Sequence, residues 1–271
     1  MQKALLICLA LLTAGCASLP SGKPDPRDPW ERFNRASYKF NDSLDRAVAK
    51  PVAKAYKKVT PRVVRTGISN FISNLGTITT IVNDVLQGKM KQAGRDSGRF
   101  LLNTTLGLGG ILDPASAAGI ERGDEDFGQT LGKWGVKSGP YLTLPFLGPS
   151  TVRDTVGRIP DQFTYPLNYV DEWEIRYGVR ALDLLELRAS LLDLDAQIEK
   201  SYDPYAFIRN AWLQRREFQV TDGDIADPSL ELEEGMEEAP AESPEAAAPE
   251  ATPAPADDRP ADAAPAPAPG G

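Results

Sequence analysis

Apolar side chains recur every three or four residues along most of this 271-residue chain, and this spacing constrains its fold more than any other feature. The spacing places apolar side chains on one side of an α-helix. No segment sustains the two-residue alternation that is typical of a half-buried strand. The sequence therefore predicts a mostly α-helical fold. One such stripe contains Leu184, Leu187, Leu191, Leu194 and Ile198.

Three helices are expected to begin at a capping residue followed by proline, a pair that suits the first helical turn. These pairs are Asp28-Pro29, Thr60-Pro61 and Asp203-Pro204. We expect Pro51 to break or kink the first helix, because proline removes an intrahelical hydrogen bond. The helix that starts at Thr60-Pro61 is expected over residues 61–75, and further helices are expected over residues 78–87, 89–105 and 172–200.

Two central segments do not fit a soluble helical bundle. Residues 106–112 are apolar but rich in glycine, and residues 141–149 are apolar but broken by proline. Both are too short to cross a bilayer, which takes about 20 residues. They fit either core turns or non-helical segments that meet lipid where other protein satisfies their backbone.

The N-terminus has the pattern of an export signal. Lys3 precedes an apolar run over residues 4–12, which ends in small residues and Cys16. This ending resembles the lipobox of bacterial lipoproteins, in which the cysteine is acylated and becomes the first mature residue. The resemblance implies a covalent lipid such as palmitate on Cys16, and Ala17 after it resembles the class delivered to the outer membrane. The alternative is an ordinary cleaved signal with an unrelated cysteine.

Composition excludes several kinds of active site. The chain has no histidine, and Cys16 is the only cysteine beyond the signal peptide. Ser-His-Asp catalysis, a cysteine nucleophile other than Cys16 and an intramolecular disulfide are therefore excluded. The acidic residues Asp113 and 124–126 match no calcium-loop spacing, so they predict a solvated turn and no metal site. We expect no cofactor besides the lipid on Cys16.

Charge divides the chain into a body and a tail. Residues 222–271 carry 14 acidic side chains and one arginine, a balance of −13, whereas the rest of the chain carries +5. The tail also has 10 prolines and 14 alanines, so it predicts a disordered segment. The predicted organisation is a signal peptide (1–15), a linker (16–27), a helical domain (28–221) and the acidic tail (222–271).

Segments along the body resemble the MlaA (VacJ) family of outer-membrane lipoproteins. The match runs in order through about residues 28–220 and leaves the tail outside it. Each motif alone would be weak, but so many in register are specific. They are DPWERFNR (28–35), Phe40-Asn41, VNDVLQG (82–88), RFLLNTTLG (99–107), Asp113-Pro114-Ala115, EDFGQTLG (125–132), Gly139-Pro140-Tyr141, Leu144-Pro145, LGPS (147–150), Arg153-Asp154 and SYDPY (201–205).

The resemblance implies a ring-like set of amphipathic helices embedded in the outer membrane of a Gram-negative bacterium, joined by short non-helical apolar turns. It implies an amphipathic channel that returns mislocalised phospholipids from the outer leaflet toward the periplasm and so maintains lipid asymmetry. The implied partners are phospholipids, a trimeric porin and a periplasmic lipid-binding carrier of an ABC transport system, with no nucleic acid. It also implies that the protein is not an enzyme.

Site residues follow from this reading as hypotheses. Arg180 and Arg176 on the long helix are candidates for the channel, because an arginine there could attract phosphate; the alternative is a solvated basic face. Asn103 is a further lipid-path candidate, or else a residue that caps its helix. Phe40 and Asn41 are candidates for a gate region, or else a packed aromatic beside a surface amide.

The apolar segment over residues 141–147 is a candidate contact for the porin or the membrane, through Tyr141, Leu144 and Phe146; the alternative is internal packing. Two other functions remain open. The protein could be a structural envelope lipoprotein that scaffolds porins without moving lipid, or a carboxylate-dependent hydrolase of lipid or peptidoglycan.

Overall fold

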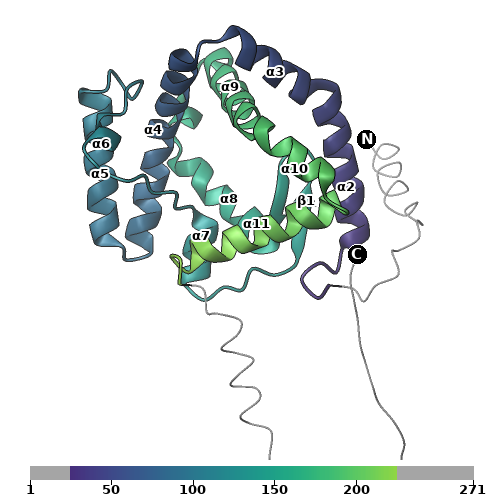
Figure 1. Cartoon of the computed structure of the whole chain (residues 1–271). Helices are drawn as coiled ribbons and strands as arrows, with labels where there is room; N and C mark the ends of the chain where they lie inside the picture. The colour runs from purple at the N-terminus through teal and green to yellow at the C-terminus, as the bar shows by residue number, and fades with distance from the viewer. Residues whose placement is uncertain (1–24, 225–271) are drawn as a thin grey trace, which may run out of the picture. The chain divides into compact units, whose positions relative to one another are not determined.

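The computed structural model describes residues 25–224, which belong to the first of the two units of the chain, residues 1–225 and 226–271. The predicted signal peptide, Cys16, most of the linker and nearly all of the acidic tail lie outside the described residues. The described part is mostly helical, as the sequence predicts (Figure 1). Its elements are α2 (Glu31–Leu44), the π-helix η1 (Asp45–Ala49), α3 (Lys50–Val59), α4 (Arg62–Leu86), α5 (Met90–Thr105), α6 (Pro114–Ala117), α7 (Phe127–Lys133), β1 (Tyr141–Leu144), β2 (Gly148–Thr151), α8 (Val152–Thr164), the 3-10 helix η2 (Pro166–Tyr169), α9 (Trp173–Leu191), the 3-10 helix η3 (Leu192–Leu194), α10 (Asp195–Lys200) and α11 (Pro204–Val220).

Helix ends differ from the prediction at several places. Pro51 does not end the first helix, but lies in the first turn of α3, directly after the wide π-turn of η1. The chain bends between α2 and α3, so the predicted kink is present and the predicted break is not (Figure 1). The two helices expected over 61–75 and 78–87 are the single helix α4. Helix α2 begins at Glu31, and Asp28 does not cap it. Asp203 does cap α11, by accepting a hydrogen bond from the Ala206 N–H.

The sequence also misses a β-hairpin. Strands β1 and β2 pair antiparallel, with Tyr141 opposite Thr151 and Leu144 opposite Gly148. Each strand has only four residues, which is too short for alternation to be recognised against helical spacing. The apolar segment over 141–149 is therefore a hairpin with a three-residue turn.

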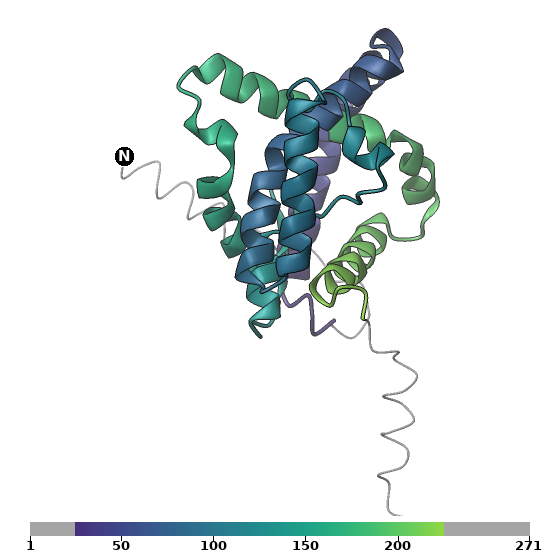
Figure 2. The same cartoon turned by 90° about the vertical axis from the view of Figure 1, so that its left-hand side faces the viewer.

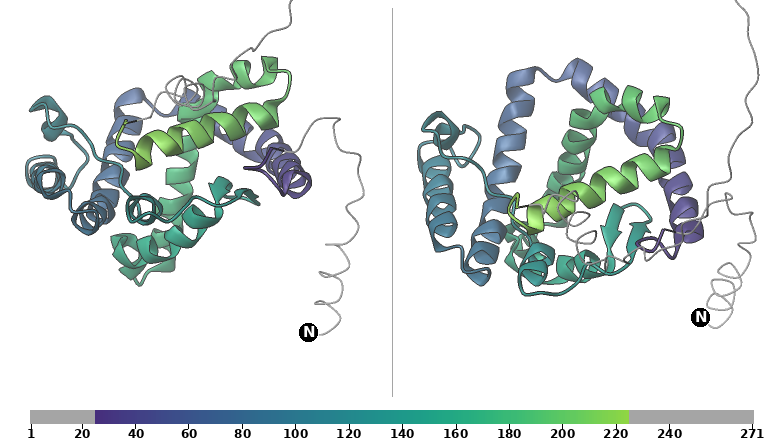
Figure 3. Two further views of the ribbon diagram at one scale, coloured as in Figure 1. Left: turned by 90° about the horizontal axis from the view of Figure 1, so that it is seen from below. Right: turned by 60° about the horizontal axis from the view of Figure 1, so that its bottom comes forward.

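The elements of this unit contact one another in a closed circuit. Helices α2 and α3 lead into α4, α4 packs against α7 and α8, α8 packs against β2, and β1 packs against α2. Figure 3 shows this circuit in its right-hand view, with α9 running across it from α3 and α4. Helix α5 packs on the outside of α4 (Figure 2). The ring-like order of amphipathic helices agrees with the predicted fold class.

Polarity in this unit is inverted relative to a soluble domain. Only eight apolar residues are buried in the described part, whereas buried polar and charged residues include Asn34, Arg99 and Asp154. The predicted apolar stripes face outward: Phe40 on α2 is 46% exposed and Leu184 on α9 is 63% exposed. Large exposed apolar surfaces mark sites that other molecules or lipids cover. Over residues 25–224, however, no helix combines the length and hydropathy needed to cross a bilayer.

Charged and amide side chains hold the interior together. The buried Asp28 carboxylate accepts hydrogen bonds from Asn34 on α2 and from Tyr205 and Arg209 on α11, so it ties these helices together. Arg216 on α11 binds both Asp126 and Asp154. Buried charges persist only when they are paired in this way. The buried polar residues therefore hold the helices together, as apolar side chains do in the core of a typical soluble domain.

Candidate functional site

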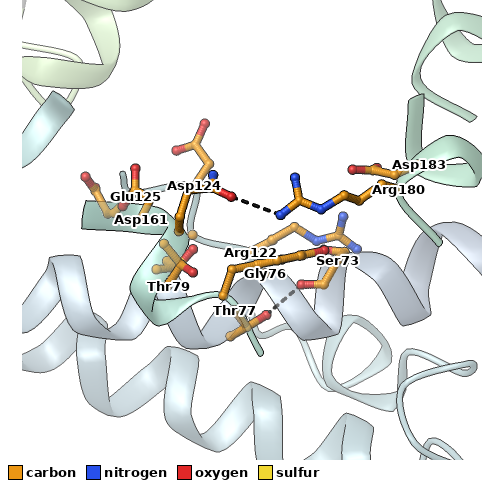
Figure 4. A pocket seen from close by; sticks show the side chains of 14 residues that line it. Ser73, Gly76, Thr77, Thr79, Arg122, Asp124, Glu125, Asp161, Arg180 and Asp183 are labelled. Carbon is orange, nitrogen blue, oxygen red and sulfur yellow. Dashed lines mark hydrogen bonds between the residues drawn. The ribbon is translucent and has the colours of Figure 1, made fainter. Parts of the chain in front are cut away.

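A polar cavity of about 460 Å³ lies between α4, α8 and α9. A loop that follows α6 forms part of its wall, so four separate stretches of the chain meet there (Figure 4). A cavity of this size, lined by hydroxyl, amide and charged side chains, can hold the polar part of a small ligand. The lining residues are Ser73, Gly76, Thr77, Thr79, Thr80, Arg122, Gly123, Asp124, Glu125, Asp161, Gln162, Tyr165, Arg180 and Asp183.

Helix α4 gives the cavity a smooth polar wall. This side of the helix carries only small side chains, among them Ser73, Thr77 and Thr80. A Cβ added at Gly76 would meet no atom within 4 Å, so this position opens onto free space. Glycine and threonine are poor helix formers, and their run in the middle of a 25-residue helix makes room for the cavity.

Arg180 on α9 reaches into the cavity without a carboxylate partner. Its guanidinium donates to Gln162 Oε1 at 2.9 Å and to Asn168 Oδ1, both neutral acceptors (Figure 4). Asp183, one turn further along α9, lines the same cavity. Burial raises the pKa of Asp183, and the charge of Arg180 opposes that rise.

Arg122 brings a second cation from the opposite loop. Its nearest carboxylate is Asp113, at 3.8 Å, and that group already binds Arg99 at 2.5 Å. Burial lowers the pKa of Arg122, and the positive charge of Arg99 lowers it further. The Arg122 charge is therefore only weakly compensated within the protein.

Two carboxylates of the wall have structural partners. Glu125 accepts hydrogen bonds from Lys89 and Gln87, both at 2.8 Å. Asp161 accepts from the Asn83 side chain at 3.0 Å and from the Phe127 N–H at 3.1 Å. Burial raises the pKa of Asp161, although these hydrogen bonds oppose the rise. These contacts fix the loop before α7 against α4 and α8.

A buried pair of acids supports the same wall from behind. Asp84 on α4 and Asp96 on α5 are both fully buried. Burial, and then the neighbouring Asp96, raise the pKa of Asp84 to about 7. Asp96 also accepts a hydrogen bond from the Gly123 N–H at 3.2 Å. A Cβ at position 123 would lie 2.5 Å from Asp96 Oδ2, so only glycine fits there.

The structure separates the three predicted lipid-path residues. Arg180 lines the cavity, whereas Arg176 and Asn103 do not. The Arg176 guanidinium lies over the Tyr177 ring, 5.4 Å from its centroid. Asn103 is buried at the end of α5, where it donates to Asp113 and accepts from the Ala115 N–H. Asn103 thus ties α5 to the start of α6, and its side chain does not cap its own helix.

The predicted gate residues and the predicted contact segment lie together. Asn41 donates from Nδ2 to the Leu144 carbonyl at 3.0 Å and accepts from the Phe146 N–H at 2.8 Å. The Phe40 and Phe146 rings meet edge to face, with centroids 5.1 Å apart. Asn41 is therefore bound to the hairpin backbone and is not a free surface amide, and Phe40 packs on Phe146 while half exposed. The gate role of this pair stays a prediction.

The three predicted contact residues differ in accessibility. Phe146 is 72% exposed and stands at the hairpin turn, and Leu144 is partly exposed. Tyr141 is 1% exposed and packs against Tyr205 and Trp212, so a direct external contact through Tyr141 is wrong. Its burial follows from the alternation along β1, which turns Tyr141 and Thr143 inward.

The acidic run before α7 is not the solvated turn that the sequence predicts. Glu125 is buried against Lys89, and Asp126 caps α7 and binds Arg216. Asp113 caps α6 and binds Arg99. Within residues 25–224 no group of three or more His, Cys, Asp or Glu side chains is placed to hold a metal ion.

Sequence reasoning missed Arg122 and the small residues of α4 as parts of the cavity. Arg122 belongs to a loop, so no helical spacing connects it to Arg180. Gly76 and the threonines after it could have been found, because a run of poor helix formers inside a long helix needs a local reason.

Comparison with known proteins agrees with the residues and the fold. The profile of the MlaA lipoprotein family matches residues 26–219. The "Intermembrane phospholipid transport system lipoprotein MlaA" of Escherichia coli (strain K12) is 41% identical over 231 residues, which cover 83% of this chain and 92% of the relative. The protein of the same description from Haemophilus influenzae is 35% identical over 244 residues, covering 85% and 96%.

A solved structure has the same fold. It is described as "Structural basis for maintenance of bacterial outer membrane lipid asymmetry". One of its chains superimposes with a TM-score of 0.65 at 40% identity, and the match covers 71% of this chain and 98% of that chain. Together with the family match over most of the described residues, this similarity settles the classification: the chain belongs to the MlaA lipoprotein family.

Proposed function

We propose that this chain is an outer membrane lipoprotein of an intermembrane phospholipid transport system. In this proposal, phospholipid headgroups pass through the cavity between α4, α8 and α9, and the transport maintains the lipid asymmetry of the outer membrane. The names of the relatives and the subject of the similar structure support the phospholipid as substrate and the outer membrane as location.

One observation carries the proposal, and it is the inverted polarity of the described unit. Helices with apolar side chains on the outside surround a cavity lined by hydroxyls and charges. Helices that lie in a membrane interface need one apolar stripe in this orientation. A charged headgroup is costly to move through hydrocarbon, so a polar path lowers the barrier to its passage. No bond needs to be made or broken, and we propose that the protein has no catalytic activity.

The finer parts of the proposal come from the family resemblance. We propose that lipid moves from the outer leaflet toward the periplasm, where a lipid-binding carrier of an ABC transport system receives it. We also propose that Cys16 carries the lipid anchor and that a trimeric porin holds the protein in place. Of the predicted contact residues, the exposed Phe146 at the hairpin turn and the partly exposed Leu144 remain accessible for such a neighbour.

The test is the phospholipid content of the outer leaflet in cells that lack the protein, measured by surface labelling. Deletion should increase the labelled phospholipid, and the wild-type chain should reverse the increase. A scaffold that moves no lipid would leave the labelling unchanged. If the protein were an enzyme, the purified protein would turn over labelled lipid or murein. Turnover that is lost when one Asp or Glu is replaced would contradict the transport proposal.

A further inference from the structure

The charged side chains of the cavity form two groups. Some are bound by other residues of the protein, and the others remain free to bind a ligand. Six charged side chains line it, two arginines and four carboxylates. The Glu125 carboxylate is neutralised by Lys89 at 2.8 Å. Both oxygens of Asp161 already accept hydrogen bonds, from the Asn83 amide and the Phe127 N–H. These two groups are part of the wall and are not free to bind a ligand.

Two cations and two anions remain. Arg180 donates only from Nη2, to the oxygens of Gln162 and Asn168, so its other N–H donors have no hydrogen-bond partner among the described residues. Arg122 has only the shared Asp113 at 3.8 Å. Asp124 accepts one hydrogen bond from the neutral Gln219 amide at 2.6 Å. Asp183 has no hydrogen-bond or ion-pair partner among the described side chains, although it lies on the same helix as Arg180.

The free charges therefore balance. An arginine guanidinium matches a phosphate group well, because its planar donors bind two oxygens at once. A carboxylate nearby would repel a headgroup that carries only negative charge, but it would attract a primary ammonium. In Figure 4 the Arg122, Arg180 and Asp183 side chains face the same space, with Asp124 on the far side.

We propose that this cavity selects zwitterionic phospholipid headgroups, with the phosphate on Arg122 and Arg180 and a primary ammonium on Asp183. This inference rests on the proposed function and adds to it the class of headgroup that is preferred. Phosphatidylethanolamine carries both groups, whereas phosphatidylglycerol carries the same phosphate and no ammonium. The two lipids with identical acyl chains form a matched pair of probes.

The experiment measures lipid bound to the full-length acylated protein. The purified lipoprotein in non-ionic detergent is mixed with phosphatidylethanolamine and phosphatidylglycerol in equal amounts, and native mass spectrometry counts each bound lipid. We expect about fivefold more phosphatidylethanolamine, which corresponds to about 1 kcal/mol. Asp183→Asn should reduce this ratio to about one while phospholipid still binds, and Arg180→Gln should weaken the binding of both lipids.

A control variant and three outcomes decide the proposal. Glu174 lies exposed on the same helix but outside the cavity, so Glu174→Gln should keep the wild-type ratio. Equal binding of the two lipids by the wild type, or an unchanged ratio in Asp183→Asn, would overturn the headgroup selection and leave the transport function standing. Failure of the wild type to bind either lipid would overturn both.

Discussion

Asn41 fixes the hairpin turn with both ends of its side-chain amide. It donates to the Leu144 carbonyl and accepts from the Phe146 N–H. Phe146 has a φ of 65°, a left-handed conformation that costs energy for a residue with a Cβ. The turn therefore depends on a residue that lies more than 100 positions away in the sequence.

Replacing this amide should loosen the turn. Asn41→Ala removes two hydrogen bonds, and we expect the Phe146 amide to exchange with deuterium about tenfold faster, as local opening becomes easier by about 1.4 kcal/mol. Asn41→Asp keeps the acceptor for the Phe146 N–H but places a carboxylate oxygen against the Leu144 carbonyl, so it should retain only part of the protection. An exchange rate in Asn41→Ala equal to that of the wild type would contradict this role.

Asp84 and Asp96 form a buried acid pair that makes stability depend on pH. Both Asp84 oxygens and Asp96 Oδ2 lack hydrogen-bond donors among the described residues. Glu125 adds further negative charge nearby, and Lys89 partly offsets it. The pKa of Asp84 is raised from 3.8 to about 7 in the folded protein. The folded state thus holds a proton that the unfolded state releases between about pH 4 and pH 7.

The free energy of unfolding should therefore fall as pH rises through this window. Asp84→Asn should remove that part of the slope and raise stability at pH 8 by roughly 1–3 kcal/mol, the cost of an unsatisfied buried group. Denaturation at pH 5 and pH 8 compares the variant with the wild type, and exposed Asp171→Asn serves as control. A variant that is less stable than the wild type at pH 8 would show that the charged pair is favourable.

Of the three predicted lipid-path residues, all on regular helices, only Arg180 lines the cavity, whereas Arg176 and Asn103 do not. Arg180 was identified from its place on a long helix, and it does line the cavity. Arg122 and the partners of Asp28 could not be predicted, because their positions depend on how distant segments pack. The sequence shows which residues can ionise, but only the fold determines which charges remain unpaired.

At the scale of elements, helix α8 presents a stripe of apolar side chains to the outside. Val156, Ile159 and Phe163 are 54%, 61% and 70% exposed. The opposite side of the helix is polar and includes Asp154 and Asp161, which pack into the interior. The helix is therefore amphipathic, and its apolar side faces away from the protein.

Changing this stripe should weaken membrane association. In a Cys16→Ala background exported through another signal, we expect the protein to remain membrane-bound through its apolar surface. Serine at Val156, Ile159 and Phe163 should release most of it, because each fully buried side chain of this kind contributes about 1.5–3 kcal/mol. Fractionation of cell membranes gives the measurement.

The matched control replaces exposed polar residues on α11, Gln214 and Glu217, by serine. This variant should fractionate as its parent does. If Cys16→Ala alone were fully released from membranes, the outward-facing stripes would not act as a membrane contact.

The sequence pattern also explains which elements were found. The stripe over residues 172–200 predicted one long helix, which the structure divides into α9, η3 and α10. The last stripe predicted α11, and Pro61 and Pro204 marked two helix starts, whereas α7 and α8 were not predicted. The hairpin was missed because four-residue strands are too short to show a periodic pattern. The two helices predicted over residues 61–75 and 78–87 form the single helix α4, and the sequence pattern did not show that they join. Short elements are set by tertiary contacts such as those of Asn41.

At the scale of the described unit, a closed circuit of helices surrounds polar residues and exposes apolar ones. The circuit was expected from the family resemblance, and helical spacing alone could not have given it. Spacing defines the two sides of a helix, but it does not tell whether the apolar side meets a core or a lipid. The position of the cavity likewise depends on contacts among α4, α8 and α9.

The central claim is that phospholipid headgroups pass through this cavity, and Gly76 offers the most direct test. A Cβ at position 76 meets no atom within 4 Å, so Gly76→Trp should place its side chain in the cavity and obstruct it. Gly94 on α5 also has open space around it but does not line the cavity, so Gly94→Trp is the matched control. Both substitutions replace a helical glycine with the same large side chain.

The decisive measurement is outer-leaflet phospholipid labelling in deletion cells that produce each variant at equal abundance. Gly76→Trp should leave the labelled phospholipid as high as in cells without the protein, whereas Gly94→Trp should restore the wild-type level. Full restoration by Gly76→Trp would contradict transport through this cavity.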